Sequence, residues 1–263
     1  SYFPEPNLSE ETSENGATLI YKAASGEIEI DAATATPWIG VYSPSGLLVN
    51  ADDGRDIAAR LHYDFDLAAG ESSLGQVAQK GISKQALLDD LSVVVSNELA
   101  QPQYSGVSLS YIPVGDINED EVVDVMDIDD FAADLRTGQP LPASADLNGD
   151  GNVTFDDRVF LVRNVLNTFL GDANLDGEFN SSDLSLVFQA SEYFDEKVGN
   201  SVWATGDWNG DGEFTSGDLV AAFKENSYEA GPRPPLTVPE PVAFAPFVAF
   251  ALLLTGYRRK PGR

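Results

Sequence analysis

Four acidic stretches share one spacing of oxygen-bearing residues. They span residues 116–127, 146–157, 172–183 and 207–218, and we call them loops 1 to 4 in chain order. Each has Asp at positions 1, 5 and 12 and Asn at position 3. Calcium takes six to eight oxygen ligands, which a twelve-residue loop supplies from alternate side chains and from the carbonyl of position 7. The spacing therefore predicts about three to four bound Ca²⁺ ions, and solvated acidic loops without metal are the alternative.

The predicted ligands are the side chains at positions 1, 3, 5, 9 and 12 and the backbone at position 7. In loop order they are Asp116, Asn118, Asp120, Val122, Asp124 and Asp127; Asp146, Asn148, Asp150, Asn152, Thr154 and Asp157; Asp172, Asn174, Asp176, Glu178, Asn180 and Asp183; and Asp207, Asn209, Asp211, Glu213, Thr215 and Asp218. Position 9 thus carries an oxygen in every copy.

Two further positions repeat in the loops. Position 6 must turn sharply, which favours glycine because glycine reaches positive φ without a steric penalty. Glycine stands there in loops 2 to 4, whereas loop 1 has Glu121 and is the weakest copy. Position 8 is apolar, as expected of a residue that bridges two neighbouring loops as a short strand, and an apolar helix face follows position 12. These residues are Val123, Val153, Phe179 and Phe214 at position 8, and Ile128 with Phe131, Leu161 with Val165, Leu184 with Phe188 and Leu219 with Phe223 after position 12.

The loops depart from the general EF-hand signature, which ends in Glu at position 12. Here position 12 is always Asp, and residues 106–114 before loop 1 have the pattern of a strand rather than of a helix. A calcium loop that ends in Asp, precedes a helix and occurs in pairs resembles the dockerin type I repeat. The resemblance implies two all-α modules of paired loops and helices, residues 115–168 and 169–230, with the phenylalanines at position 8 and in the helices buried between loops.

The same resemblance raises the question of a protein partner. Dockerins of cellulosomes contact a cohesin domain with positions 10 and 11, often as a Ser/Thr pair. Only loop 3, with Ser181 and Ser182, has such a pair. A structural role for calcium therefore stands beside cohesin binding.

The C-terminal end has a second pattern. Pro239-Glu240-Pro241 precedes an apolar run over 242–257, and Arg258-Arg259-Lys260 follow. The run is slightly shorter than the ~20 residues that span a bilayer, and the basic end obeys the positive-inside rule. This order resembles the PEP-CTERM sorting signal, which implies a linker over 231–241, a transmembrane helix over 242–263, export, and removal of the tail by a sorting protease. A buried hydrophobic helix is the alternative.

Composition agrees with an exported calcium protein. Residues 171–184 and 203–219 resemble the C-terminal region of many exported planctomycete proteins. The net charge is −28, which excludes nucleic acid and anionic membrane surfaces as partners because both would repel the chain. The chain contains no cysteine, so no disulfides stabilise it and bound ions would take their place.

The first third is predicted to be a separate unit. Residues 1–16 are polar and expected to be loose, and residues 17–114 are expected to form a small antiparallel β-sandwich. Its elements are a hairpin of 18–22 and 27–31 about a turn at Ala24-Ser25-Gly26, alternating strands over 61–67 and 107–111, and a short helix over 84–91 capped by Ser83.

Little in this unit suggests catalysis. His62 is the only histidine of the chain, and with Asp64 and Asp66 it is expected on the solvated face of a strand. A carboxylate pair is what a glycosidase needs, but an outward strand face is normally polar. Asp52-Asp53-Gly54 is expected to be a turn, and Trp38 to pack at the core or edge rather than to bind sugar. No catalytic residue is predicted.

The sequence thus predicts an exported, non-enzymatic protein in which a β-sandwich precedes two modules that fold around calcium and act in structure or docking. The alternative is a component of extracellular polysaccharide degradation or glycan binding, acting through the β-domain or a cohesin-like partner, because dockerins usually accompany glycoside hydrolases.

Overall fold

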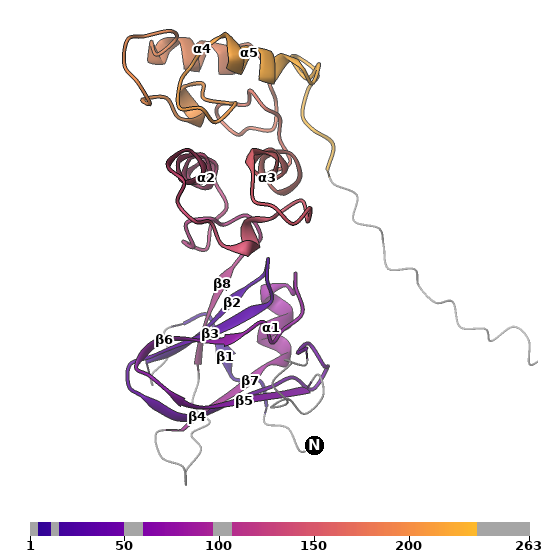
Figure 1. The fold of residues 1–263 in the computed structure, drawn as a ribbon. Coiled ribbons are helices and arrows are strands. Elements are labelled where there is room, and N and C mark those ends of the chain that lie inside the picture. Colours follow the sequence, from indigo (N-terminus) through magenta and orange to yellow (C-terminus); the bar gives the residue numbers. More distant parts are fainter. Residues whose placement is uncertain (1–4, 12–15, 50–59, 97–106, 236–263) are drawn as a thin grey trace, which may run out of the picture. The chain divides into compact units, whose positions relative to one another are not determined.

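The protein is described by a computed structural model that covers residues 5–11, 16–49, 60–96 and 107–235. Figure 1 shows the ribbon of these ranges, coloured along the sequence. Within them the buried apolar side chains form two clusters. One cluster belongs to residues 5–112, which we call the β unit, and the other to residues 113–233, which we call the loop unit.

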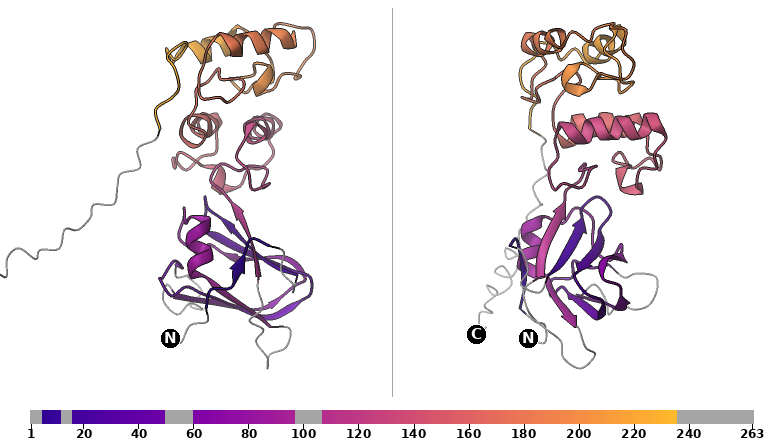
Figure 2. Two further views of the ribbon diagram at one scale, coloured as in Figure 1. Left: turned by 180° about the vertical axis from the view of Figure 1, so that it is seen from behind. Right: turned by 90° about the vertical axis from the view of Figure 1, so that its left-hand side faces the viewer.

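The β unit contains two sheets and one α-helix (Figure 2). Its elements are β1 (Leu8–Ser9), β2 (Ala17–Lys22), β3 (Glu27–Ala32), β4 (Thr36–Tyr42), β5 (Leu61–Leu67), β6 (Gly70–Gly75), α1 (Lys84–Asp90), β7 (Ser92–Ser96) and β8 (Val107–Ile112). The five-stranded sheet has the order β1-β8-β2-β3-β6, and the three-stranded sheet has the order β5-β4-β7. Apolar side chains of both sheets and Leu87 of α1 share one core.

Several local predictions for this unit are confirmed. Strands β2 and β3 pair antiparallel as the predicted hairpin, and Gly26 in their turn has φ of 76°. Alternate residues of β2 are buried, as a strand with one face on the core requires. The Ser83 hydroxyl accepts a hydrogen bond from the Ala86 amide and caps α1.

Other details of this unit differ from the prediction. His62, expected on the solvated face, is buried, and it lies opposite Val41 in the pairing of β4 with β5. The segment expected to be loose contains β1, where Asn7 exchanges two 2.7 Å hydrogen bonds with the backbone of Val93. Trp38 lies half-buried on β4, whereas residues 52–54 lie outside the described ranges.

The loop unit contains a helix after each acidic loop. Its elements are α2 (Val125–Thr137), a 3₁₀ turn (Ala143–Ala145), α3 (Phe155–Phe160) continued by a π-helical segment (Leu161–Val165), α4 (Ser181–Ala190), a 3₁₀ turn (Trp203–Thr205) and α5 (Ser216–Phe223). Helices α2 and α3 lie side by side (Figures 1 and 2). One core joins residues of all four repeats, with Ile128 and Phe131 of α2 beside Leu161, Val187 and Ala222.

The predicted fold class is wrong. The described residues form a mixed α/β fold with two sheets and five α-helices, not an antiparallel sandwich followed by all-α modules. Strand β8 pairs parallel with both β1 and β2, and two isolated β-bridges lie in the loop unit. Alternation along a strand reveals its buried face, but it does not reveal which neighbour the strand joins or in which direction.

The predicted fold class also included a transmembrane helix. Over the described ranges, no helix has both the length and the apolar character needed to cross a bilayer. The predicted segment, 242–263, is not among those ranges.

Candidate metal centre in the acidic loops

The carboxylate at position 1 holds the turn in every loop. Its Oδ2 accepts a hydrogen bond from the amide of position 6, at 2.8 to 2.9 Å in all four copies. The residue at position 6 has positive φ in every loop, between 71° at Glu121 and 90° at Gly177. The predicted sharp turn is therefore confirmed, including in loop 1, where a glutamate adopts it.

The carboxylate at position 12 joins the two ends of each loop. One oxygen accepts the amide of position 9 at 2.7 to 2.9 Å, and the other accepts an amide of position 2 or 3. Position 9 is the N-cap of the following helix and position 12 is its third residue, so the pair forms a capping box in α2, α3, α4 and α5. All four position-12 carboxylates are buried.

Positions 3 and 5 add side-chain oxygens on the outer side of each loop. The Asn at position 3 accepts the amide of position 5, and the Asp at position 5 accepts the amide of position 7. The position-5 carboxylates, Asp120, Asp150, Asp176 and Asp211, are exposed in all four copies. Each loop thus has an exposed carboxylate at position 5 and a buried carboxylate at position 12.

Loop 4 brings three carboxylates together. Oxygens of Asp207, Asp211 and Asp218 all lie within 4.8 Å of one another. Asp207 and Asp218 are buried, and Asp211 is exposed. Among the residues that the structure describes, this group could hold a metal ion, and its donors are the hard oxygens that calcium and magnesium prefer.

Burial changes the acidity of several of these side chains. It raises the pKa of Asp172, Asp207 and Asp218 above the usual aspartate value, because removing a carboxylate from water disfavours its charged form. In loop 1 it raises the pKa of Asp116 and Asp127 for the same reason. Hydrogen bonds from the loop amides oppose the effect in each case. At Asp207 the positive charge of Arg158 opposes the effect as well. A bound cation would favour the charged form of all five carboxylates.

The residue before position 1 was missed by the sequence analysis. Gly115, Gly171 and Gly206 all have positive φ, and each packs against an apolar side chain of the loop unit. A Cβ on Gly171 would lie 2.7 Å from the Phe179 ring, closer than atoms can approach. The repeated Gly-Asp pair at the start of loops 1, 3 and 4 is the signal that could have revealed this requirement.

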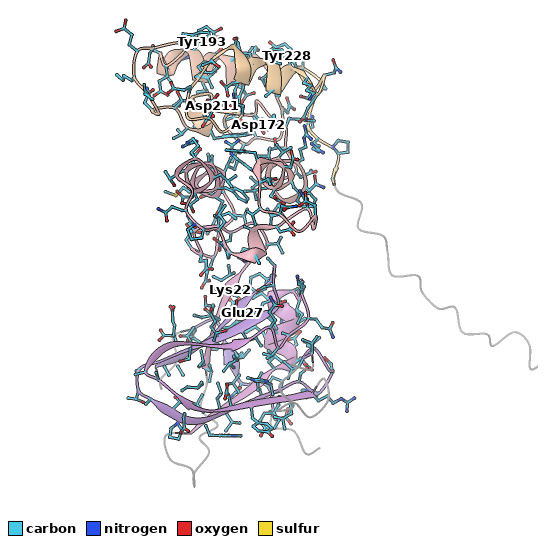
Figure 3. The ribbon with its side chains drawn as sticks, in the orientation of Figure 1. Lys22, Glu27, Asp172, Tyr193, Asp211 and Tyr228 are labelled. Carbon is cyan, nitrogen blue, oxygen red and sulfur yellow. The ribbon has the colours of Figure 1, made fainter. Side chains whose placement is uncertain are left out.

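The predicted bridge between neighbouring loops at position 8 is wrong for loops 3 and 4. Phe179 of loop 3 bridges Tyr228, which follows α5, and Phe214 of loop 4 bridges Tyr193, which follows α4. Figure 3 labels both tyrosines beside these helices. The chain after each helix thus returns to the loop of the other repeat. The two phenylalanine rings instead meet through Trp208, whose ring centroid lies 5.7 Å from that of Phe179 and 5.9 Å from that of Phe214.

The aromatic residues of this region are only partly buried, which corrects a second expectation. Phe179 and Phe214 are 1% exposed, as predicted. Phe188 and Phe223 are 47% and 41% exposed, so they lie at the edge of the core rather than between loops. Phe188 packs against the rings of Tyr193 and Phe214, and Phe223 packs against those of Phe179 and Tyr228.

Two arginines that the sequence analysis did not single out contact loop 4. Arg158 of α3 is 1% exposed and donates to the carbonyls of Ile128, Trp208 and Asp207 at 3.0 to 3.1 Å. Arg136 of α2 donates from Nη1 to Asp207 Oδ2 at 3.2 Å and to the Gly210 carbonyl at 2.9 Å. Residues 155–165 contain four charged residues, so the sequence pattern carried no signal for the burial of Arg158.

Trp203 contacts residues of both pairs of repeats in the loop unit. Its indole N–H donates to the Asp172 carbonyl at 2.7 Å, and its amide donates to Asp129 of α2 at 2.7 Å. The Arg158 guanidinium lies 5.4 Å from its ring centroid. Trp203, which lies just before loop 4, thus connects the beginning of loop 3 to α2 and α3.

The structure brings the predicted ligands of each loop into one repeated arrangement, and the carboxylates of loop 4 into one cluster. The side chains at position 9 cap helices, and at position 7 the amide is paired with the carboxylate of position 5. His62, Asp64 and Asp66 lie on β5 of the β unit, with His62 buried and Asp66 exposed.

No protein family, curated protein or solved structure matches this chain.

Proposed function

We propose that the loop unit binds calcium and that the bound ions stabilise its fold. The observation that carries the proposal is the acidic cluster of loop 4, whose three carboxylates converge in a hydrogen-bond arrangement that the other three loops repeat. Two buried carboxylates in each of loops 1, 3 and 4 would repel one another without a cation. Three to four ions, one per loop, is the stoichiometry that the repetition supports.

The donor set favours calcium over other metals. The proposed ligands are carboxylate, amide and hydroxyl oxygens, and the chain has no cysteine and one histidine, which lies in the β unit. Oxygen donors without nitrogen or sulfur suit hard cations, and a twelve-residue loop is large and flexible enough for six to eight ligands rather than the octahedral six of magnesium. Bound calcium would favour the charged form of these buried carboxylates.

We propose further that the protein is exported and non-enzymatic. The resemblance of residues 171–184 and 203–219 to exported planctomycete proteins supports export, and in an exported chain without cysteine bound ions would take the place of disulfides. Extracellular calcium modules work at dissociation constants of about 10⁻⁴ to 10⁻³ M, which matches the calcium of an external medium. The role would then be structural, because the loop unit would be rigid outside the cell, where calcium is abundant.

The test is a calcium titration of the full chain by calorimetry, with circular dichroism before and after a chelator. We expect three or four ions to bind, and the helical signal to fall when calcium is removed. Asp211→Asn is the matched variant, because this exposed carboxylate is a ligand in loop 4 only. The substitution should abolish or weaken the binding of one ion without unfolding the chain. No heat of binding and an unchanged spectrum would overturn the proposal.

A further inference from the structure

Loops 3 and 4 differ in the second hydrogen-bond donor to one atom, the Oδ2 oxygen of the position-1 carboxylate. In both loops this oxygen accepts the amide of position 6. In loop 3 the second donor to Asp172 Oδ2 is the hydroxyl of Thr168, which is neutral. In loop 4 the second donor to Asp207 Oδ2 is the guanidinium of Arg136, at 3.2 Å, which is a permanent cation.

The Arg136 side chain is well held. Besides Asp207, its Nη1 donates to the Gly210 carbonyl at 2.9 Å, and a Cβ on Gly212 would lie 3.4 Å from the guanidinium carbon. Asp207 is 2% exposed, so water screens this ion pair less than it screens a pair on the surface. Arg136 thus crosses from the last turn of α2 to the first half of loop 4 and contacts it on three residues.

We propose that Arg136 is a built-in competitor for the cation of loop 4, so that loop 3 fills with calcium before loop 4. The inference rests on the proposed function and adds an order of filling to it. A metal ion at Asp207 must share an oxygen that already has two donors and must approach a positive charge. The corresponding oxygen of loop 3 offers no such repulsion from Thr168.

The same contact makes loop 4 depend on the first pair of repeats. Arg136 belongs to α2, and α2 begins at loop 1, where Asp124 and Asp127 form its capping box. The position of the guanidinium is therefore set by a helix that loop 1 starts. Loop 4 then responds to the folding of α2 as well as to calcium concentration.

The experiment follows individual loops of the full chain in a calcium titration by amide NMR. The position-6 amides of Gly177 and Gly212 donate to Asp172 and Asp207, so each reports the occupancy of its own loop. In the wild-type chain the Gly177 signal should reach its midpoint at a calcium concentration about five- to tenfold lower than the Gly212 signal, the scale of one partly screened charge pair.

The main variant is Arg136→Gln, which removes the charge and retains a hydrogen-bond donor. We expect the Gly212 midpoint to fall about five- to tenfold while the Gly177 midpoint stays in place. Arg163→Gln is the matched control, because Arg163 loses the same charge but pairs with Glu225 of the chain after α5, outside the loops. Arg163→Gln should leave the ratio of the Gly177 and Gly212 midpoints unchanged.

Three outcomes would overturn the competition. They are a Gly212 midpoint that is unchanged or higher in Arg136→Gln, an equal shift in Arg163→Gln, and a wild-type chain in which loop 4 fills together with or before loop 3. The last needs no variant, so it decides the matter even if Arg136→Gln does not fold. If neither amide of the wild-type chain responds to calcium, the proposed function itself fails.

Discussion

At the scale of single residues, the position-12 aspartate has two roles in each loop. It caps a helix and closes the loop through amides at both ends, and it is also a proposed calcium ligand. The position-5 aspartate is also a proposed calcium ligand, but it lies at the surface and accepts only one loop amide, that of position 7. Substitutions at position 12 should therefore affect folding of the loop more than substitutions at position 5.

This division predicts different results for Asp183→Asn and Asp176→Asn in loop 3. Without calcium, Asp183→Asn should lower the free energy of unfolding by about 1–3 kcal/mol, because an amide group replaces one oxygen that accepts a buried backbone N–H. Asp176→Asn should cost under about 0.5 kcal/mol without calcium, as an exposed substitution does. Both should weaken calcium binding. Denaturant unfolding in chelator and in calcium checks this, and equal losses in chelator would contradict it.

The glycine before position 1 predicts a second residue-scale effect. Gly206 has φ of 117° and packs against the Phe214 ring, so Gly206→Ala adds both backbone strain and a clash. We expect a loss of about 2–4 kcal/mol in stability. Gly138→Ala is the control, since Gly138 also has positive φ but open space around it, and it should cost only about 1 kcal/mol. Similar melting temperatures for the two variants would show that the packing at Gly206 does not matter.

Residue spacing was therefore a good guide to the loops and a poor guide to what surrounds them. The spacing predicted the sharp turn at position 6, and Glu121 adopts it as well, although glycine was expected there. It did not predict positive φ at position 4, which Glu119 and Leu175 adopt. It also could not reveal Arg136, because that contact joins residues 71 positions apart.

At the scale of elements, each of the two tyrosine bridges joins the segment after one helix to the loop of the other repeat. The segment after α5 lies along loop 3, where the Glu229 amide donates to the Phe179 carbonyl at 2.8 Å and the Arg233 amide to the Gly177 carbonyl at 3.1 Å. The segment after α4 lies along loop 4, where the Phe194 amide donates to the Phe214 carbonyl at 3.0 Å. Each loop is thus stabilised by the chain that leaves the other repeat's helix.

This exchange predicts reciprocal effects of Tyr228→Ala and Tyr193→Ala. The Tyr228 ring lies 5.2 Å from those of Phe179 and Phe223, so its loss should weaken calcium binding in loop 3 about three- to tenfold and leave loop 4 nearly unchanged. Tyr193→Ala should do the opposite through Phe214. The Gly177 and Gly212 amides measure both. If each tyrosine acted instead on the loop of its own repeat, the bridges would have no such role.

The elements also show where sequence patterns stop being informative. Strand periodicity identified β2, β3, β5 and β8, yet the parallel pairing of β8 with β2 joins Thr18 to Ser108, far apart in sequence. Burial of His62 reverses the expected faces at the start of β5. A strand with polar and apolar residues on alternate sides has a defined period, but which side meets the core depends on partners that the period does not encode.

At the scale of the molecule, the acidic loop unit is assembled around two cations, Arg158 and Arg136. Arg158 is buried, and burial lowers the pKa of its guanidinium, although the nearby Asp207 and Asp129 oppose that change. Its three hydrogen bonds tie α2 and α3 to loop 4, so the two pairs of repeats share one core instead of forming separate ones. Two arginines of this chain of net charge −28 thus lie where the repeats meet.

The last prediction concerns pH and the whole loop unit. Burial raises the pKa of Asp116, Asp127, Asp172, Asp207 and Asp218 in the folded, metal-free chain above their values in the unfolded chain. Such groups stabilise the fold at low pH, and this contribution is lost as pH rises through the folded pKa. Without calcium, the free energy of unfolding should therefore be greater near about pH 5 than near about pH 7.5.

Calcium should reverse that dependence. Its ligands must be deprotonated, so the stabilisation that calcium adds grows with pH and is largest near neutrality. Thermal unfolding at both pH values, in calcium-free buffer and in excess calcium, measures the two curves. Repeating the series in about 1 M salt separates buried carboxylates from general surface repulsion, because salt screens exposed charges far more than buried ones. A metal-free chain that is more stable at the higher pH would mean that hydrogen bonds from the loop amides outweigh burial, and that the carboxylates need no cation to remain charged.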